Sequence, residues 1–196
     1  MKRRCVLNKI KTIRVGWRSI LVFSSLSFIF VFLPAFIITY IFSPVRLRNS
    51  VIFLASLIFY FIGCIDTPEA MLLLLAAVIL NYVFARIISA LNGWRRKLVF
   101  ILSVCYNLGW LVFFKYSAFL LSLFNISIPF FTGLRLPIGI SFYTFQCISY
   151  LADVYRKKIC AERSLLMIGT YLTMFPQLVA GPIVTYPEVH DQLISR

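Results

Sequence analysis

Long apolar runs separated by short polar clusters form the dominant pattern of this chain. Apolar residues prevail over 19–42, 69–91 and 98–124, and over 50–64 when its flanks are included. About 20 mostly apolar residues are enough for a helix to cross the hydrocarbon core of a bilayer. No segment of strand length alternates polar and apolar residues as the strands of a membrane barrel do. The pattern therefore predicts an all-α, polytopic helical integral membrane protein with helices near 21–42, 50–64, 69–91 and 98–124.

Two further apolar segments, near 137–155 and 164–184, are interrupted by proline, glycine and polar residues. The sequence reads LPIGISFYTFQCISYLADVYRKK from Leu136 and MFPQLVAGPIVTYP from Met174. Backbone groups freed by proline and glycine are tolerated at membrane depth only where protein or a watery cavity satisfies them. We expect discontinuous helices here, beside a polar tunnel or a binding site.

The uninterrupted helical part of the second segment, 164–175, would be about 18 Å long, too short for a hydrocarbon core of about 30 Å. Pro176 is expected to end this helix, and Gly181 and Pro182 break the chain again. A membrane-dipping anchor that only packs is one interpretation. A helix interrupted next to a functional site is the other, and we favour it because broken membrane helices cluster near such sites.

One face of the helix expected over 137–155 carries polar and aromatic residues. Tyr143, Gln146, Tyr150 and Asp153 follow a helical spacing, and Ser149 lies beside them. An amide that faced lipid would stay unpaired, so this stripe should face protein. Hydrogen bonds between helices would explain it. Alternatively, Tyr143, Gln146 and Ser149 line a passage for an acyl donor or acceptor, together with Gln177 from the next segment.

These residues closely resemble the membrane-bound O-acyltransferase (MBOAT) family, in particular its bacterial branch that acetylates exported polysaccharides such as alginate. The resemblance covers nearly all of residues 21–190 and concerns the N-terminal part of the family's fold. It also rests on four upstream strings: FSSLSFIFVFLP (23–34), RLRNSVIFLASLIFY (46–60), LLLLAAVILNY (72–82) and NLGWLVFFKYSAFL (107–120).

The resemblance implies an O-acyltransferase that takes acetyl groups from a cytosolic donor, acetyl-CoA, for O-acetylation of an exported, alginate-like polysaccharide. It also implies an extracytoplasmic acetyltransferase partner that completes the transfer. By the same resemblance, the region around Gln146 contributes to the wall of a central tunnel.

Family members rely on an essential histidine that lies on a membrane-embedded helix of the second half of the fold. The single histidine of this chain, His190, stands in the polar stretch YPEVHDQLISR and does not match that setting. We therefore assign no catalytic residue and expect the chain to be inactive alone. It would be either a truncated, non-catalytic remnant or one half of a split enzyme that assembles with a separate C-terminal half. A small membrane transport component ranks last, because no internal repeat is seen.

Composition and charge agree with a membrane protein in contact with a lipid bilayer. Hydrophobic residues make up 61% of the chain, and the net charge is +14. The basic residues cluster between apolar runs, as flanks of membrane spans do, so we expect no nucleic acid partner. If 44–49 is cytoplasmic, every later basic cluster is cytoplasmic too, in a multi-pass protein of the bacterial plasma (inner) membrane. The five cysteines form no C-x-x-C pair, and we expect buried thiols, no metal site and no bound cofactor.

The basic N-terminal extension, residues 1–20, conflicts with this topology, because its seven Lys and Arg would have to cross the membrane. The extension could stay cytoplasmic if 19–42 formed a hairpin, or could lie on the membrane as an interfacial helix. We favour a third interpretation, an over-extended gene start, with the membrane domain beginning at Leu21 and running over 21–196. Finding Lys2–Arg18 by N-terminal sequencing of the expressed protein would exclude it.

Overall fold

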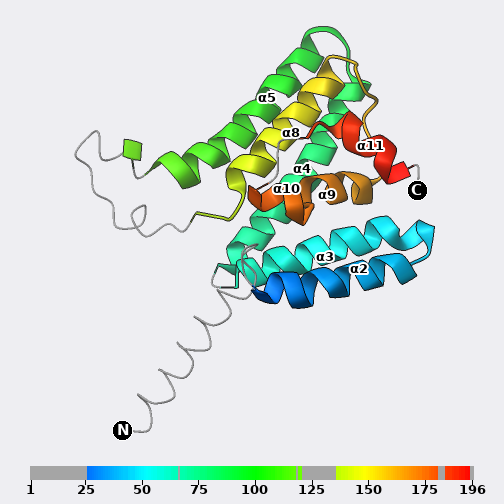
Figure 1. Ribbon diagram of the computed structural model, residues 1–196. Coiled ribbons are helices and arrows are strands. Elements are labelled where there is room, and N and C mark those ends of the chain that lie inside the picture. Colours follow the sequence, from blue (N-terminus) through cyan, green and yellow to red (C-terminus); the bar gives the residue numbers. More distant parts are fainter. Residues whose placement is uncertain (1–25, 66, 118, 121–135, 181–183, 195–196) are drawn as a thin grey trace.

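The computed structural model describes residues 26–65, 67–117, 119–120, 136–180 and 184–194, which form helices and connecting turns (Figure 1). The predicted all-α fold is confirmed, since no strand occurs in these ranges. The basic extension 1–20 lies outside the described residues. The elements are, in chain order, η1 (Phe28–Phe32), α2 (Leu33–Phe42), η2 (Val45–Leu47), α3 (Arg48–Gly63), α4 (Pro68–Ala90), α5 (Gly93–Leu111), η3 (Val112–Tyr116), α8 (Ile140–Tyr155), α9 (Leu165–Thr173), α10 (Phe175–Ala180) and α11 (Tyr186–Ile194).

Three of these helical segments are long and apolar enough to cross a membrane: Val45–Gly63, Pro68–Ala90 and Gly93–Tyr116. Large apolar side chains on their outer faces are exposed, among them Leu54, Leu72 and Leu102. Exposed apolar side chains of this kind are suited to lipid rather than to water. The described helices thus have the character of a polytopic membrane protein.

Helices α4, α5 and α8 pack on one another, and Figure 1 shows α5 and α8 side by side. The guanidinium of Arg96, near the start of α5, donates hydrogen bonds to the carbonyls of Val154 and Tyr155 at the end of α8, over 2.7 and 2.8 Å. It thereby satisfies carbonyls that a helix end leaves without an intrahelical partner. The helix expected over 98–124 therefore begins five residues earlier, at Gly93, and places its basic cluster within the first helical turns.

The basic ends of the helices gather on one side of the molecule. At the start of α3, the amide of Asn49 donates to the carbonyl of Leu193 in α11 over 3.1 Å, and the Thr170 hydroxyl of α9 donates to the Asn49 carbonyl over 3.3 Å. The Tyr82 hydroxyl of α4 donates to the carbonyl of Arg163 over 2.9 Å. These contacts bring together the segments that carry the basic clusters 46–48, 95–97 and 156–158. The arrangement fits a topology in which one membrane side carries the positive charge.

The helix that precedes Pro176 is interrupted, two residues earlier than expected. α9 ends at Thr173, and Met174 leaves the helical conformation with a ψ of 114°. Proline in a helix interior clashes with the carbonyl four residues before it, so the break lies upstream and Pro176 occupies the first turn of α10, where proline is tolerated. The backbone N–H of Phe175, freed by the break, donates to the hydroxyl of Ser56 in α3 over 3.2 Å. A neighbouring helix therefore satisfies the interrupted backbone.

Candidate functional site

Two of the residues predicted to line a passage meet between α8 and α10. The Gln146 amide of α8 donates a hydrogen bond to the Gln177 side-chain oxygen of α10 over 2.9 Å. Gln146 is 1% exposed and Gln177 is 9% exposed. Both amides are thus withdrawn from lipid, as the sequence predicted for a polar stripe in a membrane helix.

Tyr143 and Gln146 also present buried polar atoms that have no hydrogen-bond partner. These are the hydroxyl of Tyr143, a side chain only 3% exposed, and the side-chain oxygen of Gln146. Ser149 lies one turn further along α8 and is half-buried; no hydrogen bond in the described part of the chain joins it to the pair. Whether these four residues line a passage stays a prediction, because burial and pairing alone do not reveal one.

A glycine allows α8 and α10 to approach so closely. Gly139 precedes α8 with a φ of +73°, in the left-handed region that favours glycine. A Cβ at this position would lie 2.5 Å from the backbone oxygen of Leu178, the residue after Gln177. Any other residue would push α10 away, so Gly139 is a condition for the Gln146–Gln177 contact.

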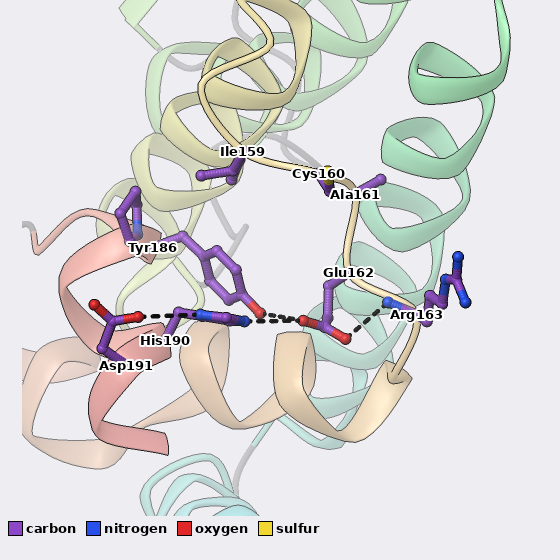
Figure 2. A pocket seen from close by; sticks show the side chains of 9 residues that line it. Ile159, Cys160, Ala161, Glu162, Arg163, Tyr186, His190 and Asp191 are labelled. Atoms are coloured by element: carbon purple, nitrogen blue, oxygen red, sulfur yellow. Dashed lines mark hydrogen bonds and ion pairs between the residues drawn. The ribbon is translucent and has the colours of Figure 1, made fainter. Parts of the chain in front are cut away.

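A second polar cluster surrounds Glu162, in the loop between α8 and α9, and lines a pocket of about 400 Å³ (Figure 2). One carboxylate oxygen of Glu162 accepts hydrogen bonds from the backbone N–H groups of Arg163 and Ser164, over 2.8 and 3.0 Å. The other accepts from the Tyr186 hydroxyl of α11 over 2.9 Å and lies 3.5 Å from Nε2 of His190. The Glu162 carboxylate therefore ties α11 to this loop. The pocket is lined by Ile159, Cys160, Ala161, Glu162, Arg163, Tyr186, Pro187, His190 and Asp191.

The contacts of Glu162 stabilise its ionised form. Burial by itself raises the pKa of this carboxyl group, but the hydrogen bonds from Ser164, Tyr186 and Arg163 and the nearby His190 lower the pKa below its ordinary value overall. Burial and the adjacent Glu162 carboxylate raise the pKa of the Tyr186 hydroxyl, which stays protonated and serves as a donor. The carboxylate is thus held as an anion by fixed donors.

The sequence placed His190 in a polar tail, and the structure places it in this pocket. Its Nε2 faces Glu162, and its Nδ1 lies 3.4 Å from a carboxylate oxygen of Asp191 (Figure 2). Each ring nitrogen therefore lies beside a carboxylate, and a neutral imidazole donates to only one of them. The contact with Glu162, which also binds Tyr186, gives His190 a role in holding α11. In the described ranges, no group of three or more His, Cys, Asp or Glu side chains could hold a metal ion.

Sequence reasoning also missed a buried amide pair between α4 and α5. Asn81 and Asn107 donate to each other's side-chain oxygens, over 3.1 and 2.7 Å. Each amide also donates to a carbonyl one turn earlier on its own helix, that of Ala77 or Ser103, over 2.8 Å. All four N–H groups and both oxygens of this pair are satisfied. Two asparagines inside apolar runs were the signal that could have indicated the pair.

Comparison with known proteins yields relatives along most of the chain. It is 38% identical over 187 residues to the probable alginate O-acetylase AlgI of Pseudomonas aeruginosa, a match that covers 90% of this chain and 35% of that protein. The corresponding protein of Azotobacter vinelandii is 39% identical over 186 residues, which cover 90% of this chain and 36% of the relative. The resemblance to the membrane-bound O-acyltransferase family is confirmed.

The family likeness extends to a second type of acetyltransferase. The peptidoglycan O-acetyltransferase of Helicobacter pylori is 31% identical over 210 residues, which cover 90% of this chain and 39% of that protein. The chain spans little more than a third of the length of these relatives, in their N-terminal part. No family model and no solved structure matches the chain.

Proposed function

We propose that this chain forms part of a membrane-embedded O-acetyltransferase of the bacterial inner membrane that modifies an exported, alginate-like polysaccharide. The observation that carries the proposal is the match of 90% of the chain to proteins named alginate O-acetylase and peptidoglycan O-acetyltransferase. The acceptors in these names are both polysaccharides, so acetyl transfer to a sugar hydroxyl is the activity that the relatives have in common.

Acetyl-CoA is the proposed donor. Its phosphate groups are anionic, and the basic clusters around 95–97 and 156–158 lie together on one side of the helices, where they would attract such a ligand. The acetyl group must then pass the membrane to reach an exported acceptor. Polar groups within the helices, such as the Gln146–Gln177 pair, favour a path of this kind.

The proposed reaction breaks the C–S bond of the thioester and forms a C–O bond to an acceptor hydroxyl; a base takes the proton of the hydroxyl, and coenzyme A leaves as a thiolate that is then protonated. In the described residues, the one histidine is engaged with Glu162 and Asp191. We therefore propose that the base comes from the part of the relatives that this chain does not match, and that this chain binds and orients the reactants. An extracytoplasmic acetyltransferase partner would complete the transfer.

A chimera tests this function. The matched N-terminal residues of the Pseudomonas aeruginosa relative are replaced by those of this chain, and the fusion is expressed in cells that lack their own copy. We expect acetylated alginate, measured as acetyl groups per sugar unit. The unaltered relative serves as the positive control, and the amount of chimera in the membrane is measured in parallel. A chimera that accumulates normally in the membrane and transfers no acetyl group would contradict the proposal.

The same two sequences also test whether this chain is one half of a split enzyme. Here this chain and the remaining part of the relative are expressed as separate polypeptides, with an affinity tag on one of them. Co-purification together with restored acetylation is expected of two halves of a split enzyme. Co-purification without acetylation would favour a non-catalytic remnant that keeps its binding surface.

A further inference from the structure

An apolar groove of about 320 Å³ lies between α2 and α3, which Figure 1 shows side by side. This volume stands at the lower end of the range for ligand pockets in proteins, about 300–1,000 Å³. The lining positions are 32 at the end of η1, then 35, 36 and 39 on α2, and 51, 54, 55 and 58 on α3. Each set follows the spacing i, i+3, i+4 and i+7 of a single helix face. The groove is therefore formed where two helix faces meet.

Two alanines make this meeting of helix faces hollow. Ala35 and Ala55 stand at central positions of the lining, between larger side chains. The other lining side chains are apolar except that of Thr39, whose hydroxyl donates to the Ala35 carbonyl over 2.7 Å. The one hydroxyl of the lining is thus used within its own helix. The groove presents hydrocarbon and suits an apolar ligand.

The aromatic wall of the groove is held in place from behind. The rings of Phe32 and Phe36 lie 5.5 and 5.4 Å from the ring of Phe175, at the start of α10. On the side of α3, Leu54 and Ile58 are 56% and 54% exposed. The groove is therefore preformed, as ligand pockets commonly are, and opens toward the surroundings of the helices. For exposed apolar faces of membrane helices, these surroundings are lipid.

A guanidinium group lies at the end of the groove nearest the connection between the two helices. Val51 is the α3 lining residue closest to that connection, and Arg48 precedes it by about one turn. The guanidinium carbon of Arg48 lies 5.3 Å from the centroid of the Tyr40 ring, which follows Thr39 on α2. Arg46, in η2, is exposed. A positive charge thus lies against both helices at the point where the hydrocarbon lining ends.

The length of the groove fits one leaflet of a bilayer. Along α3, at 1.5 Å per residue, the lining begins about 5 Å from Arg48, at Val51, and ends about 15 Å from it, at Ile58. A hydrocarbon core of about 30 Å consists of two leaflets of about 15 Å each. A helix from another segment that crossed the whole membrane would need a longer face. An acyl chain whose headgroup lies beside Arg48 would not.

We propose that this groove binds one acyl chain of an anionic phospholipid and that Arg48 and Arg46 bind the phosphate of its headgroup. A guanidinium group pairs with phosphate oxygens in a bidentate geometry. With 44–49 on the cytoplasmic side, the arginines face the leaflet whose anionic lipids attract basic segments. The chain has no acidic residue before Asp66, so no carboxylate of α2 or α3 competes for them. This site is separate from the proposed acetyl transfer and does not rest on it.

Native mass spectrometry of the purified full chain in detergent tests the headgroup site, with phosphatidylglycerol as the anionic probe. Phosphatidylcholine with the same acyl chains is the matched zwitterionic ligand. We expect one molecule of phosphatidylglycerol to bind about 10-fold more tightly than phosphatidylcholine. Arg48→Gln should weaken phosphatidylglycerol binding about 5-fold, the effect of one basic residue at an anionic headgroup. Arg86→Gln, which changes an exposed arginine of α4, is the control and should leave the binding of both lipids unchanged.

Ala55→Leu tests the place of the acyl chain, because the added side chain fills the groove. We expect it to weaken the binding of both lipids about 10-fold, without a preference for either headgroup. Ala35→Leu enters the same groove from α2 and should have the same effect, so the test does not depend on the folding of one variant. Ala90→Leu, at an exposed alanine that ends α4, is the control and should bind both lipids as the wild type does.

Glycerol phosphate and a free fatty acid separate the two parts of the ligand. Each should bind far more weakly than the intact lipid, because each makes only part of its contacts. The proposal is wrong if either fragment binds as tightly as the lipid, if phosphatidylglycerol and phosphatidylcholine bind equally, or if Arg48→Gln changes nothing. It is also wrong if both alanine variants bind lipid normally. If these variants then fail to co-purify with the remaining part of the Pseudomonas aeruginosa relative, a protein segment occupies the groove.

Discussion

Two buried amide pairs lie between helices of this protein, and they differ in how completely they are satisfied. Asn81 and Asn107 join α4 to α5 by two reciprocal hydrogen bonds, and each also bonds to its own helix. Gln146 and Gln177 join α8 to α10 by one hydrogen bond, and the Gln146 oxygen has no partner. The helices of the first pair are long and apolar enough to span a membrane, whereas α10 has six residues and follows a break.

The difference separates polar groups that hold helices together from polar groups that remain available. A pair in which every donor and acceptor is hydrogen-bonded, here called saturated, gains no further hydrogen bond from a ligand. A pair with an unpaired buried atom, here called unsaturated, destabilises the fold, so other interactions must keep it in place. At α8 that support is the apolar packing of Ile140, Tyr143 and Leu178.

The Glu162 cluster extends the comparison outside the membrane spans. Its carboxylate accepts three hydrogen bonds and lies beside His190, so it resembles the saturated asparagine pair. By this criterion, the cluster holds α11 in place, although it lines a pocket and contains the one histidine of the chain. Satisfied hydrogen bonds therefore identify a structural site even where the residue types suggest chemistry.

Gly139→Ala should have the largest effect, because it forces apart the helices of the unsaturated pair. The left-handed backbone costs about 1 kcal/mol for a residue with a side chain, and the overlap with the Leu178 oxygen adds about 2 kcal/mol. We expect the free energy of unfolding to fall by about 3 kcal/mol, measured by thermal unfolding in detergent. Gly93→Ala is the matched control: its φ is +61°, but no atom lies within 4 Å of the added Cβ. An equal decrease in the free energy of unfolding of both variants would show that the Leu178 backbone does not limit the size of residue 139.

Glu162→Ala should have the second-largest effect on stability, because it leaves the donors of Arg163, Ser164 and Tyr186 without their acceptor. Hydrogen bonds to a charged group contribute about 1.5–3 kcal/mol, and we expect a loss of about 2 kcal/mol in the docking of α11. Hydrogen exchange of the α11 amides measures this docking directly. Glu188→Ala is the control, since Glu188 is exposed and accepts one hydrogen bond, from the N–H of Thr185 over 3.3 Å. If both variants exchange equally fast, the Glu162 cluster does not hold α11.

The pH dependence of this docking has a defined sign. The pKa of Glu162 is lowered in the folded state, so the stabilisation is complete above the ordinary pKa of about 4.5 and is lost as the pH falls through the lowered value. We expect the protection of the α11 amides, relative to their intrinsic exchange rate at each pH, to fall in that acidic range. Glu162→Gln should remove this dependence, because an amide does not titrate. An unchanged acid response in Glu162→Gln would assign the effect to another group.

Asn107→Leu should cost about 2 kcal/mol, because it removes the reciprocal hydrogen bonds and leaves the Asn81 oxygen unpaired. The double variant Asn81→Leu/Asn107→Leu removes both partners and should recover part of this loss. A double-mutant cycle in detergent unfolding measures the coupling between the two residues. Additive losses would mean that the reciprocal bonds contribute nothing, and the contrast with the glutamine pair would disappear.

The sequence predicted the helices better than the contacts between them. Apolar length predicts three helices of membrane-spanning length, whereas the described part of the segment expected over 21–42 is a shorter apolar helix, Phe28–Phe42. Helical spacing predicts the polar face of α8, and the proline at 176 predicts a broken helix. The break itself lies two residues earlier than predicted, because the proline acts on the backbone that precedes it. These features depend on local chemistry and so can be inferred from a single chain.

The side-chain contacts between helices depend on how segments far apart in the sequence approach one another. The contact between Gln146 and Gln177 requires Gly139 to be glycine, and its function there is visible only beside Leu178. The link from Glu162 to Tyr186 and His190 joins a loop to a later helix, and no spacing rule connects them. The predicted passage along Tyr143, Gln146, Ser149 and Gln177 stays a prediction.

Gln146→Met should have the smallest effect, and it tests the comparison most directly. The change removes one hydrogen bond and leaves the Gln177 oxygen without its donor, but it also removes the unpaired oxygen of Gln146, so the contributions partly cancel. We expect a loss below about 1 kcal/mol in thermal unfolding, against about 2 kcal/mol for Asn107→Leu, although both variants replace a buried amide by an apolar side chain of similar size. If Gln146→Met costs as much as Asn107→Leu, the glutamine pair is structural and its oxygen has a partner in the folded protein. A difference of the expected size would mean that α8 keeps a polar group that folding does not need.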